Sequence, residues 1–311
     1  MESSSVRMVQ QGEFSNQAPT FSIIVAVYND WEKLVGCLQS LALQTNGPSF
    51  EVIIVDDGSA ETAPEFFRSS GFPYPLSMIR QPHTGIPSAR NRGIRSSTGA
   101  VLLFMDADSR PQENCLNALS STIACSPKHD CFQLRLVGNC SNLVGRAEEL
   151  RLITLQNHML QADGRIRYLN TAGFAIRRAY VDIEAGLFDP VALRAEDTLL
   201  LANLMQDGDL PFFVHDAIVE HYIPLSLMDA LRKDTRSVYL EVKTYDIIAS
   251  RGVRIRVTHR ERARLLLSMW KVSGDRSIGR SAWFALVARQ GFQRMISFGY
   301  KCLSGRSTTH S

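Results

Sequence analysis

The segment AVLLFMDAD, residues 100–108, joins an unbroken apolar run to two carboxylates. Six successive apolar residues are typical of a strand that is buried on both faces, as in the interior of a parallel sheet. Open α/β sheets bind their ligands at the carboxyl ends of such strands. Side chains two positions apart on an extended chain point the same way, so Asp106 and Asp108 face one point. Together they suit a hard divalent cation such as magnesium or manganese.

A second strand with the same kind of ending lies upstream. Residues 50–55, FEVIIV, lead into Asp56, Asp57, Gly58 and Ser59. If both strands belong to one parallel sheet, their carboxyl ends meet at the same edge. The sequence therefore predicts a polar ligand site at two strand ends, although Asp56 or Asp57 could instead cap a following helix.

Strand and helix patterns alternate around these two segments. Further strand patterns occur at residues 21–27 and 76–80, and helical patterns occur at residues 31–44 and 88–97. This alternation predicts an α/β fold with a doubly wound, mostly parallel sheet. We expect the domain that contains it to occupy residues 20–225.

The two ends of the chain differ from this domain. Residues 1–19 are polar and lack apolar periodicity, so we expect a disordered leader there. Residues 226–311 carry 17 Lys and Arg against 6 Asp and Glu, a balance of +11, whereas residues 1–225 carry 17 against 25, a balance of −8. We expect the C-terminal part to be a basic helical region. No window in it reaches the ~18 apolar residues of a membrane span.

The basic region allows two interpretations. Mixed apolar and basic residues at helical spacing can lie in a membrane interface, or they can pack on the larger domain and expose Arg to water. We favour packing and keep an anionic membrane surface as the alternative partner. Nucleic acid is not expected, because no recognised nucleic-acid motif is visible.

Cysteine usage bears on the compartment. The six cysteines lack the close paired spacing of zinc sites, and the first residues do not resemble a secretory signal. We expect free thiols and a cytoplasmic location, and the membrane-interface interpretation of the basic region would add peripheral contact at the cytoplasmic membrane face.

The order of these pieces resembles the family-2 glycosyltransferases of the GT-A fold. The resemblance implies an inverting, metal-dependent transfer of a sugar from a nucleoside diphosphate donor, usually a UDP-sugar, to an acceptor hydroxyl. It leaves the sugar, the acceptor and the oligomeric state open. The matching segments cover about residues 20–225 in the family's order: Ser22–Asn29, Val55–Ser59, Ala89–Ile94, Phe104–Asp108, Gly186–Asp189 and Glu196–Asp197.

On the donor side, the resemblance assigns Ala26, Tyr28 and Asp57 to the nucleoside. A carboxylate suits this place because it accepts hydrogen bonds from uracil N–H or ribose hydroxyl groups. Arg90 follows a Gly-Ile-Pro turn, where a helix start and a guanidinium could approach phosphate, and the resemblance places its helix beside the nucleotide. From the residues alone, Arg90 could also lie on a solvated helix face.

Asp106 and Asp108 match the family's Asp-x-Asp motif, whose second carboxylate usually ligates the metal. The resemblance therefore implies manganese or magnesium held by Asp108, with Asp106 beside the donor. His221 matches a position where many GT-A enzymes supply a His to the metal or the diphosphate. A His at a strand end can equally be structural.

Glu196 and Asp197 begin a predicted helix, where acidic residues are expected from the helix dipole alone. In the family the second acid of this pair is the catalytic base. The resemblance thus implies that Asp197 removes the acceptor proton and that Glu196 lies beside the donor. The segment Asn170–Phe174 resembles the part that faces the donor sugar, where Gly173 would permit close backbone approach, but a plain turn explains the same residues.

Two other functions are compatible with this pattern. A sugar-phosphate nucleotidyltransferase typically carries a Gly-rich loop with Arg or Lys after its first strand, whereas residues 26–30 here read AVYND. A catalytically silent nucleotide-sugar-binding or assembly subunit would be expected to lack Asp108 or Asp197, and both are present.

Overall fold

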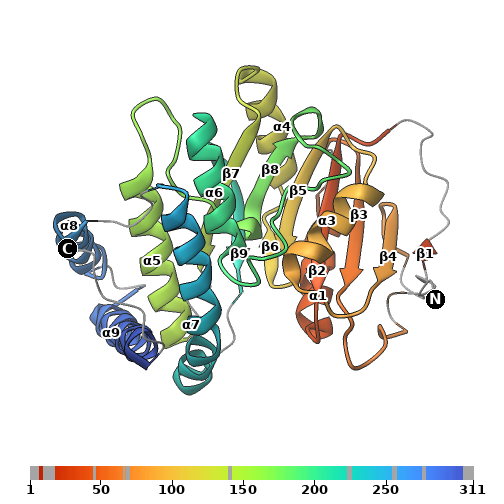
Figure 1. The fold of residues 1–311 in the computed structure, drawn as a ribbon. Helices are drawn as coiled ribbons and strands as arrows, with labels where there is room; N and C mark the ends of the chain where they lie inside the picture. Colours follow the sequence, from red (N-terminus) through yellow and green to blue (C-terminus); the bar gives the residue numbers. More distant parts are fainter. Residues whose placement is uncertain are drawn as a thin grey trace. The chain divides into compact units, whose positions relative to one another are not determined.

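The computed structural model divides the chain into two compact units, which are drawn in Figure 1. Unit 1 comprises Met1–Leu136 and Leu160–His221, and unit 2 comprises Val137–Met159 and Tyr222–Ser311. The boundary at Tyr222 lies near the expected one at residue 225, but an internal segment of the expected first domain groups with the C-terminal helices. The structure describes residues 7–9, 18–44, 47–65, 67, 71–138, 142–222, 226–253, 258–274 and 278–303.

Unit 1 is built on a sheet that has nine strands in the described part of the chain (Figure 1). Their order across the sheet is β1-β4-β3-β2-β5-β8-β7-β9-β6. Their bounds are β1 Arg7–Val9, β2 Phe21–Val27, β3 Phe50–Asp56, β4 Leu76–Arg80, β5 Val101–Asp106, β6 Ser109–Pro111, β7 Cys131–Gly138, β8 Phe174–Arg177 and β9 Phe212–His221.

One half of the sheet is parallel and the other is antiparallel. Strand β2 pairs in parallel with β3 and β5, and β3 pairs in parallel with β4. The pairs β5–β8, β7–β8 and β6–β9 are antiparallel. The mostly parallel sheet expected from the sequence is therefore found only in β4-β3-β2-β5, because the strand–helix alternation that indicates parallel pairing stops after Pro111.

The first nineteen residues are not wholly without regular structure. Arg7–Val9 form β1, which pairs antiparallel with β4 so that Arg7 lies opposite Ile79. The expected disordered leader is wrong for these three residues, whose strand is too short to produce a periodic signal. Residues 1–6 and 10–17, on which the rest of that expectation falls, lie outside the described residues.

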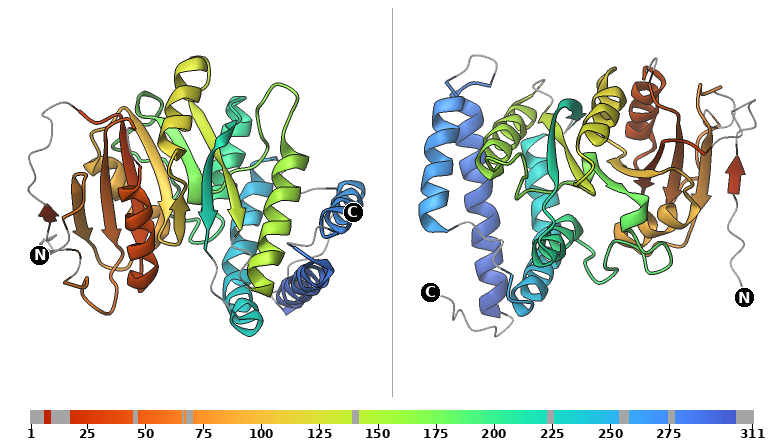
Figure 2. Two further views of the ribbon diagram at one scale, coloured as in Figure 1. Left: turned by 180° about the vertical axis from the view of Figure 1, so that it is seen from behind. Right: turned by 90° about the horizontal axis from the view of Figure 1, so that it is seen from above.

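Helices cover both faces of the sheet, as Figure 2 shows from above. Helices α1 and α4 lie on one face, and α3 and α6 lie on the other. Phe104 of β5 belongs to the same hydrophobic cluster as Ile94 of α3 and Leu204 of α6. Because β5 is covered on both sides, its apolar run is continuous rather than alternating. The bounds are α1 Trp31–Ala42, α3 Ile86–Ser96, α4 Cys115–Cys125 and α6 Glu196–Asp207, with short 3-10 turns η1 at Thr171–Gly173 and η2 at Arg178–Tyr180.

Unit 2 contains four helices in its described part. They are α5 Leu143–Met159, α7 Leu227–Ser250, α8 His259–Val272 and α9 Arg280–Leu303. Ala147 and Leu150 of α5 share a buried cluster with Met269 of α8 and Leu286 of α9. This shared core explains why α5, although it comes from the middle of the chain, belongs with the C-terminal helices.

An ion pair also joins two helices within unit 2. Arg289 of α9 donates from Nε and Nη2 to the two carboxylate oxygens of Asp234 in α7, at 2.5 and 2.8 Å. The Asp234 side chain is only 5% exposed. Such a two-bonded pair fixes the mutual rotation of the helices as well as their separation.

Two further observations concern the helices and the cysteines. Among the residues that the structure describes, no helix is long and apolar enough to cross a bilayer. Five cysteines are free, namely Cys37, Cys115, Cys125, Cys131 and Cys302, and Cys140 lies outside the described residues.

Candidate active site

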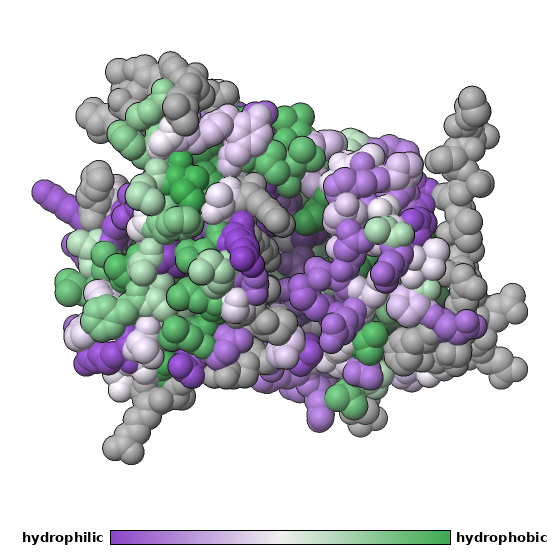
Figure 3. Space-filling model, turned by 90° about the horizontal axis from the view of Figure 1, so that it is seen from below, coloured by the Kyte–Doolittle hydropathy of each residue, from purple (hydrophilic) through white to green (hydrophobic). Residues whose placement is uncertain are grey.

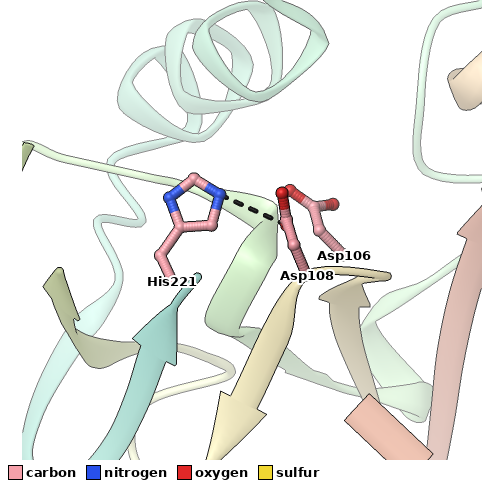
Figure 4. A group of neighbouring side chains, drawn as sticks. All are labelled: Asp106, Asp108 and His221. Atoms are coloured by element: carbon pink, nitrogen blue, oxygen red, sulfur yellow. Dashed lines mark ion pairs between the residues drawn. The ribbon is translucent and has the colours of Figure 1, made fainter. Parts of the chain in front are cut away.

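Two carboxylates and one imidazole gather where β5 and β9 end (Figure 4). The chain leaves β5 at Asp106 and enters β6, which pairs with β9 so that Ser109 lies opposite His221. This register brings His221 to the two aspartates, and one ligand atom from each of Asp106, Asp108 and His221 lies within 4.8 Å of the others. His221 Nε2 is 3.3 Å from Asp108 Oδ1.

The chemistry of this group fits a divalent cation. Carboxylate oxygens are the ligands that magnesium and manganese prefer, and imidazole nitrogen is a further ligand for transition metals. The side chains of Asp108 and His221 are 17% and 18% exposed. They are therefore held in place by their surroundings and still reach solvent, as a site that must admit a ligand requires.

Ser109, which the sequence analysis did not single out, fixes the turn that carries the aspartates. Its hydroxyl accepts a hydrogen bond from the backbone N–H of Asp106 at 3.1 Å and donates one to the carbonyl of Ala172 at 2.9 Å. The turn is thereby tied to η1. A small hydroxyl residue directly after Asp-x-Asp is the signal that could have identified it.

Arg90 connects the end of β5 with the start of α6. Its side chain is 2% exposed, and it donates from Nη2 to Asp106 Oδ1 at 2.7 Å and from Nη1 to Glu196 Oε1 at 2.5 Å. The guanidinium also lies 5.3 Å from the ring centre of Phe188. Burial tends to lower the pKa of Arg90, but the charges of Glu196 and Asp106 outweigh burial and raise it.

These contacts decide between the alternatives for Arg90. The residue does not lie on a solvated helix face, because its guanidinium is buried against two protein carboxylates. Its predicted approach to phosphate stays a prediction. The interaction that the structure contains is a bridge that holds Asp106 and Glu196 in fixed positions.

Asp197 lies directly after Glu196 at the start of α6. Its Oδ1 accepts a hydrogen bond from the backbone N–H of Thr198 at 2.6 Å. Burial, and then the charge of Glu196, raise the pKa of Asp197 to about 7, against the opposing effects of Thr198 and Arg90. A carboxyl with a pKa near neutrality can accept a proton at physiological pH.

The residue before this acidic pair has an unusual backbone. Ala195 has a φ of 57°, in the left-handed region that non-glycine residues rarely adopt. Such a conformation costs on the order of 1 kcal/mol, and strained residues of this kind cluster at functional sites. It turns the chain sharply before α6, where Glu196 and Asp197 follow.

Asp57 is engaged by the loop that leads to α3. Its Oδ1 accepts from Gln81 Nε2 at 2.8 Å and from the backbone N–H of Thr84 at 3.0 Å, and its Oδ2 accepts from the N–H of Gly85 at 2.9 Å. His83 Nδ1 lies 2.8 Å from Oδ2. The carboxylate therefore holds the loop against the end of β3, and its predicted contact with a nucleoside stays a prediction.

Tyr28 lies beside the same loop. Its ring stacks on His83 with a centroid distance of 4.1 Å, and the residue is 45% exposed. The turn that carries Tyr28 is held by Asn29, whose N–H donates to Ser59 Oγ at 2.9 Å and whose φ is 56°. A partly exposed aromatic pair at a strand end offers a flat surface for a planar ligand.

Ala26 and Gly173 are placed differently. Ala26 lies in β2, opposite Val55 on one side and Asp106 on the other, and so belongs to the edge that carries the aspartates. Gly173 is buried, and a Cβ on it would lie 2.9 Å from Leu136 Cδ2. Core packing accounts for this glycine, and its predicted proximity to a donor sugar stays a prediction.

Asn91 has a structural role that the sequence did not indicate. Its side chain accepts from the N–H groups of Leu187 and Phe188, both at 3.0 Å, and donates to the carbonyl of Phe188 at 2.7 Å. It thus fixes the turn at Gly186 that places Phe188 against Arg90. An Asn inside a predicted helix, next to an Arg assigned to the site, is the sequence signal that could have identified it.

Comparison with known sequences identifies relatives of the same kind. The profile described as "Glycosyl transferase family 2" matches residues 22–184, which is more than half of the chain. Glycosyltransferase AglE of Haloferax volcanii is 37% identical over 109 residues, 34% of this chain and 36% of that protein. A PGL/p-HBAD biosynthesis glycosyltransferase of Mycobacterium bovis is 38% identical over 93 residues, 29% of this chain and 36% of that protein. The chain thus matches about a third of the length of these two relatives.

Solved structures with the same fold extend over nearly the whole chain. S. aureus TarS 1–349 in complex with UDP has a TM-score of 0.55 at 17% identity and covers 94% of both chains. The mannosyltransferase PcManGT from Pyrobaculum calidifontis, in complex with GDP-Man and Mn2+, has a TM-score of 0.57 at 16% identity and covers 92% of this chain and 89% of that chain. These likenesses confirm the predicted GT-A fold class with its helical C-terminal region. With the profile match over more than half of its length, the chain belongs to glycosyl transferase family 2.

Proposed function

We propose that this protein transfers a sugar from a nucleoside diphosphate donor to an acceptor hydroxyl, with inversion at the anomeric carbon. The observation that supports this most is the bridge through Arg90. This buried cation joins Asp106, in the carboxylate and imidazole group, to Glu196, which directly precedes Asp197. The groups that we assign to the leaving diphosphate and the groups that we assign to the acceptor are thereby connected through one buried side chain.

On the donor side, we assign Asp108 and His221, with Asp106 beside them, to a divalent cation, manganese or magnesium. Such a cation supplies positive charge next to a departing diphosphate. Ala26, Tyr28 and Asp57 would surround the nucleoside. A UDP-sugar is the first candidate, supported by the family resemblance and by the fold shared with the UDP complex of TarS. A GDP-sugar is the second, because PcManGT was solved with GDP-Man.

On the acceptor side, we assign Asp197 as the general base. Its carboxylate would take the proton of the acceptor hydroxyl while that oxygen forms the bond to the anomeric carbon. The bond from that carbon to the diphosphate breaks on the opposite face, which inverts the configuration. A pKa of about 7 is well matched to this step, because a base with a pKa near the working pH is both unprotonated and basic enough.

The proposal includes a cytoplasmic location, since the free cysteines suit a reducing compartment. The acceptor is left at its chemical class, a hydroxyl group. The acceptor-binding loops differ most among proteins of one fold, so fold similarity does not transfer their specificity.

The test is a panel of nucleotide sugars with manganese or magnesium, in which released nucleoside diphosphate is measured with the purified full chain. We expect release from one UDP-sugar that depends on the cation. Asp108→Asn should abolish cation-dependent release, whereas Asp163→Asn, at an exposed aspartate away from the site, should leave it unchanged.

The two alternatives to this function give different results, the silent binding subunit in this assay and the nucleotidyltransferase in an incubation of a sugar phosphate with a nucleoside triphosphate. Asp197→Asn should keep donor binding and lower the transfer rate by about 10²–10⁴-fold, the usual contribution of a general base. Wild-type protein that binds UDP-sugars but releases no diphosphate would instead be a silent binding subunit. Formation of a nucleotide sugar from a sugar phosphate would indicate a nucleotidyltransferase.

A further inference from the structure

Helix α9 has an exposed apolar stripe along its whole length. Phe284, Met295 and Phe298 are 59%, 64% and 62% exposed. They are separated by eleven and three positions, which places them on one face of a helix. Residues between and after them on that face are also small or apolar, so the stripe consists of Phe284, Ala288, Gly291, Met295, Phe298 and Cys302.

Aromatic side chains extend this stripe onto α8. Trp270, which is 38% exposed, lies 5.0 Å from Trp283 and 6.2 Å from Phe284 between ring centres. The guanidinium of Arg280 lies over the Trp270 ring at 3.7 Å. Tryptophan with a cation against its ring is well suited to the boundary between lipid and water, where one part of the side chain is apolar and the other polar.

Beside Trp270, the exposed face of α8 is cationic around the apolar side chain of Leu267. Arg260, Arg264 and Lys271 are exposed there and flank Leu267, which is 64% exposed. In the described parts of α8 and α9 with their caps, residues 258–274 and 278–303, eight Lys or Arg stand against one acidic residue, Glu261. The carboxylate of that residue bonds to Thr258 in the helix cap.

We propose that α8 and α9 form a surface that lies in the interface of an anionic phospholipid membrane. On the face drawn in Figure 3, hydrophobic side chains gather over the helices of unit 2. An apolar stripe flanked by cations has the character of an interfacial helix, and no described helix is apolar enough to span the bilayer. Apolar side chains would enter the acyl boundary while Arg and Lys contact lipid phosphates.

The charge pattern favours lipid over a second copy of the chain as the occupant of this surface. In a symmetric dimer the same patch meets itself, so the cations of one copy would face those of the other. Like charges brought together in this way oppose association. An anionic bilayer offers both parts of the required complement, because it has negative phosphates at the surface and apolar chains beneath them.

The test is co-sedimentation of the full chain with vesicles of phosphatidylcholine alone or of equal parts phosphatidylcholine and phosphatidylglycerol. We expect binding only to the anionic vesicles, weakened by salt because the charge contribution is screened. Arg264→Gln with Lys271→Gln should weaken binding about twenty-five-fold, since each cation near such a surface contributes about fivefold. Phe284→Ser with Phe298→Ser should weaken it at least tenfold by removing apolar insertion.

Matched variants in unit 1 control for general changes of charge and hydropathy. Lys128→Gln and Val191→Ser alter exposed residues far along the chain, and binding should not change. All four altered residues in unit 2 are exposed, so the variants should keep the wild-type melting temperature. Equal binding to both vesicle types, or no binding, would overturn the proposal. So would a dimer in analytical ultracentrifugation that the Phe284→Ser, Phe298→Ser variant abolishes, because the stripe would then serve self-association.

Discussion

At the scale of single residues, the burial of Arg90 decides what its replacement does. The side chains of Arg90 and Glu196 are 2% and 10% exposed, so neither charge is well solvated when the other is absent. Two buried partners of opposite charge compensate each other's loss of water. Removal of one partner leaves the other charged, buried and unpaired, which is far more harmful than loss of a surface ion pair.

Arg90→Met should lower the free energy of unfolding by about 3–5 kcal/mol, the usual cost of breaking a buried pair by removing one partner. Urea denaturation followed by circular dichroism measures this. Arg95→Met, on the same helix but exposed, should change stability by no more than about 0.5 kcal/mol. Similar losses in the two variants would contradict the bridge to Glu196 and Asp106.

The raised pKa of Asp197 predicts opposite pH effects on stability and on rate. The folded-state pKa of about 7 lies above the ordinary value of 3.8, so between these pH values the folded protein binds a proton that the unfolded chain has lost. The contribution of this group to stability therefore falls as pH rises from 3.8 to about 7. The unprotonated base accumulates over the same range, so kcat/KM for transfer should rise and level off above a pKa near 7.

Glu196→Gln is the variant that tests the cause of this shift. Two effects raise the pKa of Asp197, namely burial and the negative charge of Glu196. Loss of that charge should therefore move the rising limb of the rate profile to lower pH. A limb that stays in place would show that Glu196 does not contribute to the shift and that burial is what raises the pKa. A limb that moves to higher pH would contradict the proposed interaction.

At the scale of helices and strands, the sequence was most informative for elements that can be identified from their own residues, without contacts to distant parts of the chain. The strands β2, β3 and β5 are continuous apolar runs that end in polar residues, so their positions and the site at their carboxyl ends followed from local pattern. The Asp-x-Asp aspartates were singled out for the same reason, whereas the acidic pair at α6 was singled out through the resemblance to the family, because the helix dipole alone explains acidic residues there. Contacts between distant elements were not predictable in this way.

Three such contacts shape the site. Strand β6 is three residues long, so no periodicity indicates that it pairs with β9 and brings His221 to Asp108. Asn91 holds the turn after Gly186 across 96 positions of sequence. The same holds for Arg90, because nothing local distinguishes it from Arg92 and Arg95 of the same helix as the Arg that is buried between carboxylates from β5 and α6.

Gly186→Ala tests the contact between α3 and the turn that follows η2. The φ of Gly186 is +83°, and a Cβ there would lie 2.5 Å from Cγ of Asn91. Gly208→Ala is the matched control, because its φ is +80° and a Cβ would meet nothing within 4 Å. Alanine in the left-handed region costs about 1–2 kcal/mol at either position.

Gly186→Ala should lose a further ~1–3 kcal/mol, because displacement of Asn91 leaves buried polar groups without their hydrogen bonds. Thermal and urea unfolding of both variants give the difference. Equal losses would mean that Asn91 moves aside without harm, and the turn would then not depend on it.

At the scale of the whole molecule, unit 2 is assembled from two separate parts of the chain. Its hydrophobic cluster contains Ala147 and Leu150 of α5 together with residues of α8 and α9. A chain that ends after residue 225 would keep α5 and lose the helices that cover it. The exposed apolar surface that results favours aggregation.

We therefore expect a chain of residues 1–225 to aggregate during purification, as measured by size-exclusion chromatography with light scattering. A chain that ends after residue 303 keeps all four helices of unit 2 and should elute like the full-length protein. A monomeric 1–225 chain with a cooperative melting transition would contradict the shared core of α5 and the C-terminal helices.

This discontinuity also has a consequence during synthesis. The first residue of α8, His259, is made 100 positions after the last residue of α5, Met159. At about 5–20 residues per second, α5 waits roughly 5–20 seconds outside the ribosome before its partners exist. Over that interval the apolar face of α5 is available to chaperones or to neighbouring nascent chains. Slower translation between the two helices should therefore lower the yield of correctly folded protein.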